Sequence, residues 1–188
     1  MVLYHGSVTP GISALQPVSA LHGSPEDKVV YLTGSAPYAL FYIWDAQHNK
    51  KAGKHVTCRL QNGVVYYEEQ FDGQLRAFYQ GVSGWLYRAE GTEDFFPVQD
   101  RESMWASRKP VPLCRAEFIP DVYEAILLCV KEGYVVVTQM PSDMRAQLRQ
   151  HLAELILQNG WLKDPECEEA CFYRTYFPLS WQDALEMQ

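Results

Sequence analysis

The stretch VVYLTGSAPYALFYIW, residues 29–44, predicts a strand that leads directly into an aromatic-rich helix. Its first four residues are β-branched, aromatic or apolar, the composition of a buried strand. Ser35 is a suitable N-cap, and Pro37 is tolerated in a first helical turn. We expect the helix to end at Gly53, after a run at residues 48–51 whose cations suit a helix C-terminus.

Three tyrosines distinguish this stretch from an ordinary core segment. Tyr31 lies at the end of the expected strand, while Tyr38 and Tyr42 are one helical turn apart and so share a face. Tyrosine combines a flat apolar ring with a polar tip and is usually placed where one end is buried and the other is wet. Two interpretations are open: the rim of an amphipathic helix, or a pair of rings that clamps a planar ligand.

Upstream, a second short strand is expected over residues 1–4, and it delivers His5, Gly6 and Ser7 at its end. Residues 16–28 contain two prolines and an acidic pair, which predicts a surface loop that leads to the central strand.

Downstream, Asn62-Gly63 between two β-type runs predicts a hairpin of residues 55–60 and 64–69. Asp121 and Ser142 are expected to cap helices that end before Gly133 and Gly160. Further strands are expected at 84–90, 102–107, 111–118 and 134–140, and a short helix at 75–79. The pattern predicts a mixed α+β fold with a largely antiparallel core over residues 1–140, and a helical, aromatic extension at 141–188 packed on the same domain.

Composition narrows the classes of function. The chain has 188 residues and a net charge of −7, which argues against broad electrostatic binding to nucleic acid or to an anionic membrane. No apolar run approaches the ~20 residues of a membrane-spanning helix, so we expect a cytoplasmic protein. The five cysteines are odd in number and scattered, as reduced thiols are. Cys167 and Cys171 lack further ligands nearby, so no metal site is expected.

The sequence lacks GxGxxG, GxxxxGK[ST], HExxH and GxSxG, the common cofactor and hydrolase signatures. What remains is His5-Gly6-Ser7 after the first strand, Tyr31-Leu32-Thr33 in the second, and Tyr42 in the helix. With these motifs the chain resembles the ADP-ribosyltransferase-fold family, in particular its H-Y-E group of diphtheria-toxin-like and poly(ADP-ribose)-polymerase-like domains. The resemblance implies a split antiparallel β-sheet core with flanking helices, and it assigns residues 1–140 to that domain.

The resemblance also implies a site for NAD as co-substrate. His5 would hydrogen-bond a ribose hydroxyl, and the backbone of Gly6 would bind the nicotinamide amide. Tyr31 and Tyr42 would face opposite sides of the nicotinamide ring. Peripheral polar contacts would come from Ser7 or Thr33. A flat aromatic ligand held by ring stacking is consistent with these residue types.

The family's catalytic glutamate is assigned to Glu102, which follows a loop and opens an expected strand. In the family this carboxylate bonds the nicotinamide ribose and stabilises the positive charge that develops as nicotinamide leaves. Glu68 and Glu69 of the hairpin are its rivals, and Glu90 and Glu117 are weaker candidates.

Three functions follow from the resemblance. The first is an NAD-dependent mono-ADP-ribosyltransferase that modifies a protein or nucleic-acid acceptor and releases nicotinamide. The second is a catalytically silent domain of the same fold that binds a nucleotide or a protein partner. The third is RNA 2′-phosphotransfer, for which Tyr31 stands where that family has its second histidine. A carboxylate in the cleft, within reach of Tyr31 and His5, would distinguish the first from the second.

Overall fold

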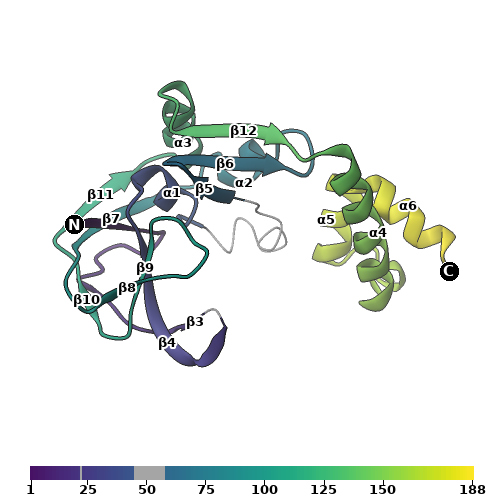
Figure 1. Cartoon of the computed structure of the whole chain (residues 1–188). Coiled ribbons are helices and arrows are strands. Elements are labelled where there is room, and N and C mark those ends of the chain that lie inside the picture. Colours follow the sequence, from purple (N-terminus) through teal and green to yellow (C-terminus); the bar gives the residue numbers. More distant parts are fainter. Residues whose placement is uncertain (22, 45–57) are drawn as a thin grey trace.

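The computed structural model of the chain describes residues 1–21, 23–44 and 58–188 (Figure 1). The largest sheet is built from β1 (Val2–Ser7), β3 (Ser19–Leu21), β4 (Ser24–Thr33), β7 (Gly84–Glu90), β8 (Phe95–Pro97), β9 (Met104–Ser107) and β11 (Arg115–Ile119). Its order is β11-β7-β1-β4-β9-β8, with β3 added on β4. Every strand pair in this sheet is antiparallel. The fold is therefore α+β with a mostly antiparallel core.

Two smaller sheets complete the β structure. The first contains β5 (Cys58–Gln61), β6 (Val64–Glu69) and β12 (Val135–Gln139). In it β5 and β6 form an antiparallel hairpin, whereas β12 runs parallel to β6. The second pairs β2 (Ala14–Leu15) with β10 (Val111–Pro112).

The helices are α1 (Ala36–Leu40), α2 (Gln74–Tyr79), α3 (Val122–Lys131), α4 (Ser142–Gln158), η1 (Trp161–Lys163), α5 (Glu168–Tyr176) and α6 (Pro178–Glu186). The first three lie among the sheets, and α4, α5 and α6 gather beyond the end of β12 (Figure 1). Ring stacking of Phe71 on Tyr176, with centroids 4.6 Å apart, joins these last helices to the region between β6 and α2.

The alternation of β4 sends its side chains to two separate clusters. Val29 belongs to the main core, which also takes in α1, α2, α3 and the C-terminal helices. Its neighbours Val30 and Leu32 belong to a smaller cluster with Leu3 and Val111. Because successive strand side chains point to opposite faces, both faces of the large sheet are covered. The expected buried strand is thus confirmed.

Several sequence-based expectations are confirmed. Ser35 caps α1, since its Oγ accepts a hydrogen bond from the Tyr38 backbone N–H at 3.3 Å. Asp121 caps α3 in the same way through Glu124. The Asn62-Gly63 turn joins β5 to β6, although residues 55–57 of the expected hairpin lie outside the described part of the chain.

Other expectations are wrong. Strand β1 runs through His5-Gly6-Ser7 instead of ending before it, because all of these residues pair with β7. Residues 16–28 are not a loop throughout, because β3 and the first half of β4 form a hairpin arm there. Helix α1 ends at Leu40 and residues 41–44 are not helical, whereas residues 45–53 of the predicted helix lie outside the described residues.

The remaining differences concern where segments begin. Strand β9 begins at Met104 and not at Glu102, because Ser103 has a positive φ of 52° and so belongs to a turn. A short strand that the sequence did not predict, β8, precedes β9 and pairs with it. The N-cap of α4 is Pro141, so Ser142 is its first helical residue and makes no capping bond.

Candidate functional site

The candidate site opens where β1 and β4 separate. Strand β1 pairs with β7 over six residues, but its register with β4 has a single Cα pair, Tyr4 with Thr33. Continuing that register would place Gly6 opposite Tyr31, and both residues instead line a cavity. The large sheet is thus split between these two strands, at the positions of the two sequence motifs.

His5 spans this split. Its Nδ1 lies 3.3 Å from the carbonyl oxygen of Tyr31. Because a carbonyl can only accept, Nδ1 carries the proton and Nε2 is left as a hydrogen-bond acceptor. Burial lowers the pKa of His5 below its usual 6.5, which keeps the ring neutral at pH 7. The site therefore offers a neutral imidazole that can accept a hydrogen bond from a hydroxyl.

An inner cavity of about 170 Å³ lies at the split. Its lining residues are mostly apolar or aromatic, and they are Tyr4, His5, Gly6, Ser19, Tyr31, Leu32, Thr33, Ala39, Tyr42 and Met104. Met104 reaches it because β9 pairs with β4, with Thr33 opposite Met104. The dimensions and the lining suit one small planar ring better than an extended polar ligand.

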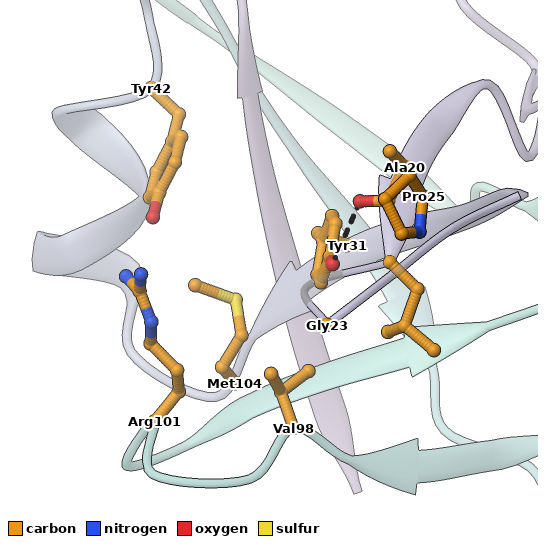
Figure 2. A pocket seen from close by; sticks show the side chains of 9 residues that line it. Ala20, Gly23, Pro25, Tyr31, Tyr42, Val98, Arg101 and Met104 are labelled. Carbon is orange, nitrogen blue, oxygen red and sulfur yellow. Dashed lines mark hydrogen bonds between the residues drawn. The ribbon is translucent and has the colours of Figure 1, made fainter. Parts of the chain in front are cut away.

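Two tyrosines flank the cavity, and each is held in place by a hydrogen bond. The hydroxyl of Tyr31 donates to the carbonyl oxygen of Ala20 on β3 at 3.1 Å. The hydroxyl of Tyr42 lies 3.4 Å from that of Tyr38, and the two rings meet edge to face with centroids 5.4 Å apart. Burial raises the pKa of the Tyr42 hydroxyl, so it stays protonated. Figure 2, which draws the larger adjoining cavity that both tyrosines also line, shows Tyr31 and Tyr42 on its opposite sides.

A larger outer cavity of about 510 Å³ continues from the inner one and shares Tyr31, Tyr42 and Met104 with it. Its other lining residues are Ala20, Leu21, Gly23, Pro25, Val98 and Arg101. Arg101 is the one permanently charged residue among the described residues of the two cavities. Its guanidinium lies beside the Tyr42 hydroxyl (Figure 2).

The structure gathers five of the expected site residues around the inner cavity: His5, Gly6, Tyr31, Thr33 and Tyr42. Thr33 also accepts a hydrogen bond from the Ser35 backbone N–H at 3.1 Å, which helps to turn the chain into α1.

Ser7 is not among the residues that line the cavity. Its Oγ accepts a hydrogen bond from the backbone N–H of Thr9 at 3.1 Å. Its local role is therefore to shape the chain as it leaves β1.

Position 6 has no room for a side chain. A Cβ built there would lie 2.1 Å from the carbonyl oxygen of Ala39 and 2.9 Å from Ile43. The absence of a side chain thus lets α1 rest directly on β1, which places Tyr42 at the cavity.

Glu102 lies outside both cavities. Its two carboxylate oxygens accept hydrogen bonds from the backbone N–H groups of Asn62 and Gly63, each at 2.7 Å. It lines an adjoining hollow of about 210 Å³, which shares Arg101 with the outer cavity. Its carboxylate is therefore occupied by the β5–β6 turn.

The rival glutamates are engaged elsewhere too. Glu68 forms an ion pair with Arg59 at 2.8 Å. Glu69 is buried and accepts from the Leu75 backbone N–H at 2.8 Å and from Gln139 Nε2 at 2.8 Å, which ties β6 to α2 and β12.

Glu90 and Glu117 are exposed on β7 and β11, away from the lining of either cavity. Among the described residues, no aspartate or glutamate lines the inner or the outer cavity.

Sequence reasoning missed Met104 as a residue of this site. It reaches the inner cavity through the β4–β9 pairing, and no local pattern announces this pairing. Sequence reasoning also missed Arg101, one of several basic residues in this part of the chain. Of the others, Arg108 forms an ion pair with Asp27 and Lys109 with Asp94.

Comparisons with models of known protein families, with curated proteins and with solved structures find no match to this chain. Within the described ranges, the side chains that commonly bind metals do not gather into a group of three or more. Every helix described is too short or too polar to cross a lipid bilayer.

Proposed function

We propose that this chain binds a nicotinamide dinucleotide of the NAD type, with the nicotinamide ring in the inner cavity. The observation that carries the proposal is the convergence of His5, Tyr31 and Tyr42 on one small apolar hollow where β1 and β4 separate. The three residues come from two strands and from the segment after α1. They are the residues that the resemblance to the H-Y-E group associates with NAD.

The chemistry of the hollow fits such a ligand. Tyr31 and Tyr42 present flat rings from opposite sides, which suits a planar aromatic group. The neutral His5 offers Nε2 as an acceptor for a ribose hydroxyl. The backbone of Gly6 borders the same hollow, where peptide groups can pair with a carboxamide.

Binding is better supported than group transfer. Cleavage of the bond between nicotinamide and ribose develops positive charge on the sugar, and a fixed carboxylate close to it would stabilise that charge. No described aspartate or glutamate lines either cavity. The proposed function is therefore that of the catalytically silent alternative, a nucleotide-binding domain.

Mono-ADP-ribosyl transfer to a macromolecular acceptor is the second candidate, and one observation favours it. The hollow that holds Glu102 adjoins the outer cavity and shares Arg101 with it. Release of Glu102 from the Asn62-Gly63 turn would give the site a carboxylate on its border.

Calorimetric titration with NAD, together with an assay of nicotinamide release over hours, tests the two candidates. We expect saturable binding without release. His5→Ala and Tyr31→Ala should each raise the Kd about 3- to 10-fold, since each removes one hydrogen bond or one ring contact. His151→Ala and Tyr134→Ala, at exposed positions of α4 and of the turn before β12, are matched controls that should leave the Kd unchanged.

Each other outcome has a definite meaning. Release of nicotinamide that is lost in Glu102→Ala would favour the transferase. Absence of NAD binding, or equal weakening by the control variants, would overturn the proposal.

A further inference from the structure

Within the described part of the chain, the outer cavity is bordered by one permanent cation, the guanidinium of Arg101. Arg101 has no ion pair with any described residue, whereas Arg108, Lys109 and Arg149 all pair with aspartates. Most of the surfaces around Arg101 are apolar, including Leu21, Pro25 and Val98. An unpaired guanidinium at the wall of an apolar cavity favours an anionic group of a ligand, because that group would replace the missing partner.

The loop that carries Arg101 has an unusual backbone. Asp100 and Ser103, on either side of the Arg101-Glu102 pair, have positive φ angles of 57° and 52°. Residues other than glycine adopt this conformation uncommonly, aspartate more readily than most, and surrounding contacts stabilise it. Two bonds, from Val98 N–H to Met104 O at 2.9 Å and from Met104 N–H to Arg101 O at 3.2 Å, close the loop.

Glu102 supplies the contact that holds the loop from outside. Its two oxygens accept from the N–H groups of Asn62 and Gly63 at 2.7 Å, short distances typical of charge-assisted bonds. These N–H groups belong to the tight turn between β5 and β6. With Glu102 turned toward the hairpin, the preceding residue Arg101 lies at the cavity beside Tyr42 (Figure 2).

We infer that Arg101 forms a phosphate subsite in the outer cavity and that Glu102 is its positioning residue. The subsite would take the diphosphate of a nucleotide whose base or ring enters the cavities, so the ligand class is a nucleoside diphosphate derivative. Arg101 binds two phosphate oxygens through its planar guanidinium, and Glu102 acts only through the loop. This inference rests on the proposed function, because that function supplies the ring that enters the inner cavity.

Three ligands separate the subsites: NAD, ADP-ribose, which lacks nicotinamide, and nicotinamide riboside, which lacks phosphate. Arg101→Gln should raise the Kd for NAD and ADP-ribose between about 10- and 100-fold, because a hydrogen bond to a charged group is lost. The Kd for nicotinamide riboside should stay unchanged. Added salt should weaken NAD binding by the parent protein more than by this variant. Arg115→Gln, at an exposed position of β11, is the matched control.

The ligand series distinguishes failure of the subsite from failure of the proposed function. Equal affinity of the parent and Arg101→Gln for NAD would overturn the subsite while leaving NAD binding in place. Binding of ADP-ribose that depends on Arg101, with no binding of nicotinamide riboside, would support the subsite and overturn the nicotinamide site. Absence of binding of all three ligands would overturn both.

The positioning role of Glu102 has its own test. Glu102→Ala should raise the Kd for NAD about 3- to 10-fold with no change for nicotinamide riboside, and Glu102→Gln, which keeps one acceptor, should have a smaller effect. In both variants the amide protons of Asn62 and Gly63 should exchange faster with solvent. In the Arg101→Gln background, Glu102→Ala should have no further effect on the NAD affinity.

This last result is decisive, because the effects of two substitutions on binding do not add when one residue acts through the other. A full additional loss in the Arg101→Gln background would overturn the positioning role. So would equal weakening of nicotinamide riboside, which would indicate a general loss of structure.

Discussion

Gly6→Ala should destabilise the protein and displace α1 from β1. A Cβ at this position would meet the carbonyl oxygen of Ala39 at 2.1 Å and Ile43 at 2.9 Å, whereas ordinary contacts begin at 3.4 Å. The obstacle is backbone, so the helix must move by roughly 1 Å or the strand must bend, as in other overpacked cores.

The expected loss of stability in Gly6→Ala combines an effect on the folded state with an effect on the unfolded state. Overpacking costs typically 1–3 kcal/mol, and a contact this short against backbone belongs at the upper end. Alanine restricts the unfolded chain and so returns about 0.4–1 kcal/mol. We therefore expect the free energy of unfolding to fall by about 2 kcal/mol.

Gly34→Ala provides the matched control. Its Cβ would lie no closer than 3.6 Å to Ser103, so the change is unhindered. Both variants alter the unfolded chain in the same way, and the difference between them isolates the steric effect of Gly6. We expect Gly34→Ala to be neutral or slightly stabilising.

Urea unfolding followed by tryptophan fluorescence measures both variants. With a slope of about 2 kcal/mol per molar urea, the Gly6→Ala midpoint should fall by about 1 M. The affinity for NAD should fall as well, because Ala39 and Tyr42 line the inner cavity. Equal midpoints for the two glycine variants would refute the reasoning that α1 is seated on β1 through the missing side chain.

Two further predictions concern titration and burial. Burial lowers the folded-state pKa of His5, so the unfolded chain binds more protons, and the free energy of unfolding should decrease as the pH falls below about 6.5. Urea unfolding at several pH values should show a weaker decrease in His5→Asn. An unchanged decrease in this variant would contradict a buried neutral imidazole. Glu69→Gln places an amide where the buried carboxylate accepts hydrogen bonds from Leu75 and Gln139, so it should lower the free energy of unfolding by about 1–3 kcal/mol. Glu68→Gln, at a more exposed site, should lower it by less than about 1 kcal/mol. Thermal or urea unfolding measures both.

Local features of the fold could be predicted because their causes are local. The Asn62-Gly63 turn is found with φ angles of 52° and 77°, the left-handed conformations that these two residues adopt most easily. Ser35 and Asp121 cap α1 and α3 because a side-chain oxygen reaches an N–H group three residues ahead.

Segments whose structure depends on pairing with distant residues were predicted wrongly. Residues 16–28 have the composition of a loop, yet they form β3 and much of β4, because the arm pairs with itself and Tyr31 fastens it to Ala20. The expected strand over 102–107 starts late, since the turn at Ser103 aligns β9 with the end of β4.

The candidate site likewise has features that could be predicted locally and features that could not. The amino-acid order sets which chemical groups are available: a histidine next to a glycine, and tyrosines at the end of a strand and after a capped helix. It also determined their nearest neighbours, because strand alternation and capping act over a few residues.

Which of these groups share the cavity depends on tertiary contacts. Separation of β1 from β4 opens the hollow, and pairing of β4 with β9 brings Met104 into it and Arg101 to its border. The bond of Glu102 to a distant hairpin turn removes that carboxylate from the site. These outcomes depend on contacts between segments far apart in the chain, whose free energy no local pattern encodes.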